Sequence, residues 1–184
     1  MYFEGSGRLL FKELDLPGAY LVEIEPRADE RGFFARTFCE DEFAATGLVT
    51  RFRQTSVSYN ACRGTVRGMH FQAAPHQEIK LVRCVSGAVH DVIVDVRPGS
   101  PTYLRSIGVE LSAKNRSALY IPGGFAHGFQ TLLDDSELLY MIDVNYVAEA
   151  SRGVRWNDPS LRLQWPDPIK VISGRDLEFP DWQP

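Results

Sequence analysis

The sequence predicts a mostly β protein with a jelly-roll fold. After residue 64, apolar and polar residues alternate in a series of short segments typical of β-strands: 65–71, 79–85, 88–97, 103–111, 117–122, 127–133 and 137–146. The sequences between them, such as RPGSP at 97–101 and DDS at 134–136, are strong turn signals. Short strands at this spacing favour a sandwich or barrel over alternating β and α units.

The remaining segments are expected to complete one domain over residues 1–184. The further elements predicted are a strand at 17–27, a turn at 29–32, a strand at 33–38, a short helix at 40–46 and a strand at 50–60. The helix is predicted because its first turn is acidic and Gly47 follows it. From residue 147 the chain is rich in Trp and Pro, and we expect an ordered coil that wraps over the barrel.

The composition limits the classes of partner. A formal net charge of −4 argues against a general role in binding nucleic acid or a membrane surface. No apolar run approaches the roughly 20 residues that span a bilayer, and the N-terminus lacks the apolar stretch of a signal peptide. Cys39, Cys62 and Cys84 share no CxxC spacing, so free thiols and a cytoplasmic location are expected.

Titratable residues concentrate in one stretch, RGMHFQAAPHQEIK at 67–80. Such a density inside an apolar β frame is typical of acid–base or metal chemistry. Strict alternation would place Arg67 on one face of its strand and His70 on the other. Tyr140 lies in an apolar row, where it either packs in the core or presents its hydroxyl to an interior cavity.

A catalytic metal is not expected. Metal-binding jelly rolls of the cupin type carry an HxH motif followed by a glutamate, and later a PxGxxH motif. The later motif is present and ends at His127, but His70 is followed by Phe and Gln, and His76 with Glu78 is a poor substitute. His90 alternates with valines and fits a structural histidine.

Proton transfer without a metal is the chemistry that the residues fit better. It needs a base, a carboxylate to orient the base, a cation for oxyanion charge and an acid on the opposite face. His70 could supply the base, Arg67 and Lys80 the cations, and Tyr140 the acid. Several aspartates could orient the histidine, and spacing does not choose among them. The chain has no GxSxG, GxGxxG or P-loop motif.

Nearly the whole chain resembles the dTDP-4-dehydrorhamnose 3,5-epimerase family of sugar-nucleotide epimerases. The matching segments include DERGFF at 29–34, QTSVS at 54–58, RGTVRGMHFQ at 63–72, QEIKLVRCVSGAVHDVIVDVR at 77–97, IPGGFAHGFQTL at 121–132, LLYMIDVNY at 138–146, GVRWNDPSL at 153–161 and ISGRD at 172–176. They occur in collinear order, and RGMHFQ with IPGGFAHGF at this separation is a specific signal.

The resemblance implies a cupin-like jelly-roll homodimer that needs no metal and no cofactor. Its substrate would be a nucleoside-diphosphate 4-keto-6-deoxyhexose, from a pathway that makes an unusual deoxysugar. A C4 ketone acidifies the hydrogens on C3 and C5, so a base can remove one and leave an enolate. Return of a proton to the other face inverts the centre, and the ketone itself is the electron sink.

The resemblance also implies residue roles. The catalytic set would be His70 as base, Asp176 to orient it, Tyr140 as acid and Lys80, together with Arg67, to stabilise the enolate. The substrate-binding set would be Arg31 and Arg67 at the diphosphate, Gln54 at the base, Phe34 and Tyr146 as stacking surfaces, Ser56 on the binding side, and His127 at the sugar, with Asp91 supporting either His127 or Lys80. Residues 17–37, and with them Arg31 and Phe34, would pack across the dimer into the partner's site.

Three positions depart from the family's pattern and leave the substrate open. Arg36 and Ser151 stand where the family usually has glutamate, and Ser56 where it usually has asparagine. Reversal of charge on a binding surface changes ligand choice. The alternatives are therefore an epimerase of C3 alone or C5 alone, an epimerase for another nucleotide, and a jelly roll that binds a sugar nucleotide without catalysis.

Overall fold

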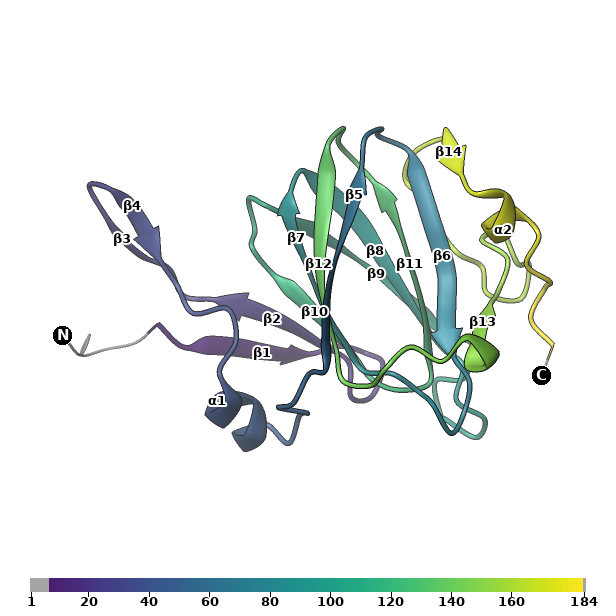
Figure 1. The fold of residues 1–184 in the computed structure, drawn as a ribbon, viewed down its shortest axis with the longest axis horizontal. Helices are drawn as coiled ribbons and strands as arrows, with labels where there is room; N and C mark the ends of the chain where they lie inside the picture. The colour runs from purple at the N-terminus through teal and green to yellow at the C-terminus, as the bar shows by residue number, and fades with distance from the viewer. Residues whose placement is uncertain (1–6, 184) are drawn as a thin grey trace.

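The computed structural model, which describes residues 7–183, is built from two facing β-sheets (Figure 1). The first sheet has the strand order β1 (Leu9–Glu13), β2 (Tyr20–Ile24), β10 (Ala118–Ile121), β7 (Lys80–Ser86), β12 (Ser136–Ile142) and β5 (Gln54–Asn60). The second has the order β13 (Ser151–Gly153), β6 (Thr65–Gln72), β11 (Phe125–Thr131), β8 (Ala88–Asp95) and β9 (Ser106–Ser112). The predicted all-β, jelly-roll class is confirmed.

The remaining elements lie around the two sheets. They are the hairpin of β3 (Arg27–Asp29) and β4 (Gly32–Phe34), the helix α1 (Glu40–Ala45), the 3-10 helix η1 (Ala148–Ala150), the short strand β14 (Val171–Ile172) and the helix α2 (Gly174–Leu177). The β3–β4 hairpin projects from the barrel on the side opposite β14 and α2 (Figure 1). No helix of residues 7–183 is long and apolar enough to cross a membrane.

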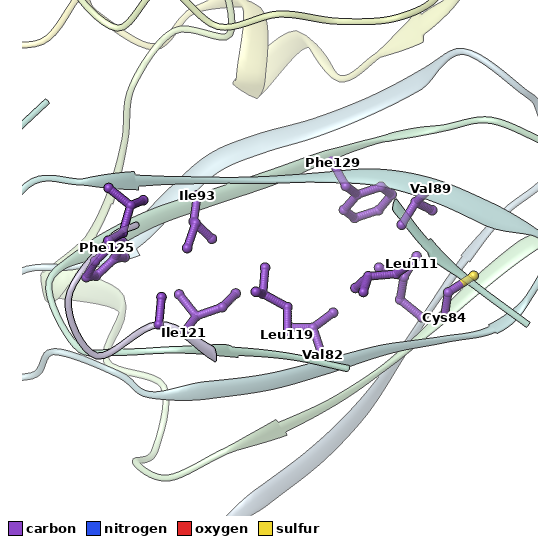
Figure 2. Close-up of a cluster of buried hydrophobic side chains, with 12 residues drawn as sticks. Val82, Cys84, Val89, Ile93, Leu111, Leu119, Ile121, Phe125 and Phe129 are labelled. Carbon is purple, nitrogen blue, oxygen red and sulfur yellow. The ribbon is translucent and has the colours of Figure 1, made fainter. Parts of the chain in front are cut away.

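The core between the sheets is apolar. Figure 2 shows side chains from both sheets pointing toward one another, among them Val82 and Leu119 from the first sheet and Ile93 and Phe129 from the second. These four residues are 0–1% exposed. Alternation along each strand places these side chains inward, and burial of each stabilises the sandwich by about 1.5–3 kcal/mol.

The sequence missed some elements and misplaced the ends of others. The strand β1 was not predicted, and the strand predicted at 17–27 is shorter, because residues 14–19 form the turn between β1 and β2. Strand β12 ends at Ile142 rather than 146. The C-terminal tail does wrap over the second sheet, but β13 and β14 add to that sheet as strands, where coil was expected.

The face assignment within β6 was wrong. Opposite β11, His70 pairs with His127 while Arg67 pairs with Phe129, so β6 spans three residues where β11 spans two. This bulge turns both Arg67 and His70 toward the space between the sheets, whereas strict alternation separates them. Met69 instead packs under the tail, in the cluster that contains Val154 and Leu161.

Two glycines make the bulge sterically feasible. Gly68 has φ +115°, and a Cβ on it would lie 2.6 Å from the Cα of Gly128 on β11. A Cβ on Gly128 would lie 2.8 Å from the carbonyl oxygen of Arg67. The strands therefore approach too closely for any side chain at either position.

We predict that Gly68→Ala lowers the free energy of unfolding by about 3 kcal/mol, because it combines an unfavourable φ with a backbone clash. Gly99→Ala is the control: Gly99 has φ +79°, but a Cβ added there would have no atom within 4 Å, so a loss of about 1 kcal/mol is expected. Urea unfolding measures both values. Equal losses would show that the approach of the two strands does not limit position 68.

Candidate active site

A cavity of about 270 Å³ lies between the two sheets. The residues that line it are Arg67, His70, Glu78, Lys80, His127, Gly128, Phe129, Tyr140 and Ile142. Five of the residues singled out from the sequence therefore meet in one place, although they come from four strands. Base, acid and cation candidates around one partly enclosed space can act on a single small molecule.

His70 is fixed by the C-terminal tail. Its Nε2 lies 2.7 Å from Oδ1 of Asp176 in α2, and its ring makes an edge contact with Phe179, the centroids being 5.6 Å apart. The other carboxylate oxygen of Asp176 accepts a hydrogen bond from the Gly68 N–H at 3.1 Å. The same carboxylate thus fixes both the bulge and the histidine ring.

The carboxyl group of Asp176 is held in its ionised form beside His70. Burial opposes the ionisation of Asp176, but the hydrogen bonds from His70 and Gly68 outweigh it and keep the pKa of this carboxyl below its usual value. The ionised carboxylate accepts a hydrogen bond from the ring N–H of His70 and orients the ring. The His70 side chain is 40% exposed, so it is accessible to a molecule in the cavity.

A second histidine–carboxylate pair lies deeper. Nε2 of His127 is 2.8 Å from Oδ1 of Asp91, and both side chains are at most 5% exposed. Oδ2 of Asp91 is buried and has no hydrogen-bond partner among residues 7–183. From the sequence, Asp91 was expected to support either His127 or Lys80, and the structure pairs it with His127.

Tyr140 faces the same cavity from the opposite sheet. Its ring makes an edge contact with His127 at a centroid distance of 6.0 Å. Burial raises the pKa of Tyr140 well above its usual value; the charge of Asp91 adds to this effect and that of Arg67 opposes it. The phenol is therefore protonated at neutral pH and is available as a proton donor.

Lys80 pairs with an acidic residue that the sequence analysis had not placed in the site. Its Nζ is 2.9 Å from Oε1 of Glu78, and the two side chains are 9% and 12% exposed. Oε2 of Glu78 accepts a hydrogen bond from Nε2 of Gln72 at 3.3 Å. Glu78 had been considered only as a poor metal ligand, because sequence spacing gave no sign of its contact with the lysine.

Arg67 donates to neutral groups. Its Nε lies 2.7 Å from Oδ1 of Asn60, and an Nη lies 3.3 Å from the carbonyl oxygen of Tyr59. Arg67 and His70 also line a neighbouring cavity of about 320 Å³, whose other basic residue is Arg175. Arg175 was not predicted; it donates to Oγ of Ser151 at 3.0 Å.

The other predicted binding residues fall into two groups. Gln54 and Ser56 lie on the edge strand β5, where Ser56 is directly opposite Tyr140; Oε1 of Gln54 accepts from the N–H of Tyr146 at 3.2 Å. Arg31 and Phe34 lie on the β3–β4 hairpin and do not line the cavity of their own chain. The Arg31 side chain is 82% exposed, and Phe34 is 74% exposed.

The sequence positions that depart from the family pattern are also separated. Arg36 lies before α1, where its guanidinium pairs with Glu42 at 2.6 Å. Ser151 begins β13, close to α2.

No group of three His, Cys, Asp or Glu side chains within residues 7–183 is arranged to hold a metal ion.

Known proteins share both the sequence and the fold. The sequence model of the dTDP-4-dehydrorhamnose 3,5-epimerase family matches residues 13–183. A dTDP-4-dehydrorhamnose 3,5-epimerase of Sinorhizobium fredii is 42% identical over 177 residues, which cover 94% of this chain and 89% of the relative.

Two solved structures illustrate the range of relatives. The dTDP-4-dehydrorhamnose 3,5-epimerase of Bacillus anthracis, with TDP and PPi bound, superposes with a TM-score of 0.92 at 38% identity and covers 95% of this chain and 100% of its own. A 3'-monoepimerase of Streptomyces bikiniensis in complex with dTDP-quinovose has a TM-score of 0.85 at 35% identity and covers 91% and 85%. This chain is an isomerase that belongs to the dTDP-4-dehydrorhamnose 3,5-epimerase family.

Proposed function

We propose that the protein inverts C3, C5 or both in a nucleoside-diphosphate 4-keto-6-deoxyhexose, with dTDP-4-dehydro-6-deoxy-D-glucose as the first substrate to test. The observation that carries the proposal is the hydrogen bond between His70 and Asp176 on one side of a cavity whose opposite side carries Tyr140. A base and an acid on opposite faces of a sugar ring are what inversion of a carbon centre requires.

The reaction follows from the positions of these groups. His70 removes the hydrogen from the carbon next to the ketone, and the electron pair moves onto the ketone oxygen. The Lys80 ammonium stabilises the resulting enolate, and Tyr140 donates a proton to the other face of the carbon. Because the ketone accepts the electrons, the proposed chemistry uses neither a metal nor a cofactor.

The nucleotide end is assigned to the more exposed residues. Arg67, whose guanidinium donates only to neutral groups in the contacts described above, would take the diphosphate, since guanidinium groups suit phosphate oxygens. Gln54 and Ser56 would contact the base, and Tyr146 would stack on it. His127, supported by Asp91, would contact the sugar.

We further propose a homodimer in which the β3–β4 hairpin of one chain reaches the cavity of the other. Arg31 and Phe34 do not line the cavity of their own chain, and the β3–β4 hairpin that carries them projects from the barrel (Figure 1). Apolar side chains are also exposed on β5 and β7, among them Val57 at 59% and Val85 at 43%.

We place the enzyme in the cytoplasm, because its three cysteines are free thiols.

The first experiment is proton NMR of dTDP-4-dehydro-6-deoxy-D-glucose in D₂O with the purified protein. Deuterium at both C3 and C5 indicates a double epimerase, and deuterium at one carbon indicates a single-centre enzyme. If neither hydrogen exchanges, the proposed substrate is wrong, and sugars on other nucleotides are tested next.

His70→Ala is predicted to abolish deuterium entry while it leaves the affinity for dTDP within about threefold, because a base acts in proton removal rather than in nucleotide binding. His76→Ala is the control, since His76 is exposed on the loop after β6. Solvent exchange and calorimetric titration with dTDP measure the two effects. Exchange at the wild-type rate in His70→Ala would remove this residue as the base.

Tyr140→Phe is predicted to reduce formation of inverted product by about 100-fold and to reduce loss of the substrate hydrogen much less, because a missing acid affects the second proton transfer. The control is Tyr103→Phe, whose hydroxyl contacts Trp182 in the tail. Both rates come from one NMR time course. An equal fall in the two rates would indicate that Tyr140 positions the substrate and does not donate the proton.

The shared site is tested by mixing two inactive variants, Arg31→Ala and His70→Ala. If Arg31 serves the partner's cavity, each mixed dimer has one intact site, and an equal mixture regains about a quarter of wild-type activity after subunit exchange. The control mixes His70→Ala with Asp176→Asn. His70 and Asp176 serve the site of the same chain, so each mixed dimer has two damaged sites and no recovery is expected. No recovery in the first mixture contradicts the shared site.

A further inference from the structure

Glu78 is the one acidic residue of the cavity lining that the proposed reaction leaves without a role. It lies just before β7, two residues from Lys80, and its side chain points to the same side of the strand. Its carboxylate contacts Lys80 of the first sheet and Gln72 of the second sheet. Each of its two carboxylate oxygens has a separate partner.

The pair with Lys80 is mostly buried. The distance of 2.9 Å and the exposures of 9% and 12% distinguish it from a surface ion pair, which solvent would screen. In a buried pair, removal of one charge leaves the other uncompensated. The lysine side chain is a stem of four carbons joined by rotatable bonds, so an ammonium without a fixed partner would sample many positions.

Gln72 anchors the carboxylate from the facing sheet. Its Oε1 accepts the N–H of Val147 at 2.7 Å, which fixes the orientation of the amide and turns its NH₂ group toward Glu78. The same NH₂ group lies 3.5 Å from the carbonyl oxygen of Asn145. Glu78 is therefore held between the two sheets, and it holds Lys80 in turn.

We propose that Glu78 is a positioning residue, which fixes the Lys80 ammonium where the enolate oxygen forms. The ammonium has three N–H donors, so it can keep its bond to Glu78 and donate a second bond to the enolate. A cation already in place stabilises the transition state without a reorganisation step. This inference rests on the proposed function, in which Lys80 stabilises the enolate.

Kinetics of Glu78→Gln test the proposal. The substitution keeps the size of the side chain and removes its charge. We expect kcat for solvent exchange to fall by about 10- to 100-fold with KM within about threefold, because only the stabilisation of the transition state is lost. Glu110→Gln on β9 is the matched control, an exposed glutamate outside the cavity, and should leave both constants unchanged. A rise in KM at constant kcat would mean that Glu78 contacts the substrate, and would overturn the proposal.

A second comparison asks whether Glu78 acts through Lys80. In a Lys80→Met background, Glu78→Gln should produce no further fall in the exchange rate, because the group that it positions is already absent. The same fold-change in both backgrounds would overturn the proposal. Glu78→Asp retains the charge and should lie between the wild type and Glu78→Gln in kcat; it also serves as the test variant if Glu78→Gln does not fold.

A measurement without substrate separates this inference from the proposed function. In ¹H–¹⁵N spectra of lysine ammonium groups, Lys80 should give a signal that is slow to exchange with water, and Glu78→Gln should shift or remove it while Glu110→Gln does not. An unchanged signal in Glu78→Gln would overturn the proposal even if the enzyme is active. A wild type without exchange activity but with the expected ammonium signal would contradict the proposed function and leave the contact between Glu78 and Lys80 supported.

Discussion

The close approach of β6 and β11 is the constraint on which the site depends. Gly68 and Gly128 bring two backbones together and allow one extra residue in β6. Without that bulge, Arg67 and His70 would point to opposite sides of the second sheet. Asp176 then binds the Gly68 N–H with one oxygen and His70 with the other, so the tail stabilises both the distortion and the side chain that the distortion turns inward.

Charge in the cavity is arranged by pairs. His70, His127 and Lys80 each have a carboxylate partner, namely Asp176, Asp91 and Glu78. Each pair fixes a side chain that would otherwise rotate. Arg67 differs, because it donates to an amide and to a backbone carbonyl. Its positive charge is less compensated locally, which fits the end of the cavity assigned to the diphosphate.

The sequence predicted what depends on local pattern. Turn sequences and alternation located most strands, and the concentration of titratable residues at 67–80 pointed to a site. The partner of His70 could not be derived from spacing, because Asp176 is 106 residues away and only the path of the tail brings it to β6. The sequence also did not predict the contact of Glu78 with Lys80. Two residues this far apart lie on the same side only where the backbone is extended, and the predicted strand began at residue 79, after Glu78. Alternation assigned Arg67 and His70 to the wrong faces of β6, because the bulge is a register shift against β11 that the sequence of β6 alone does not show.

The same local contacts bear on substrate choice. Arg36 is expected to stand where the family usually has a glutamate, and in the structure its guanidinium pairs with Glu42 of α1. Its charge is therefore largely compensated. Ser151 is likewise expected to stand in place of a glutamate, and its hydroxyl accepts a hydrogen bond from Arg175, which lines the neighbouring cavity together with His70. A hydroxyl leaves the guanidinium charge uncompensated where a carboxylate would neutralise it. Of these two positions, 151 is therefore the one that we expect to change the charge that an anionic ligand meets.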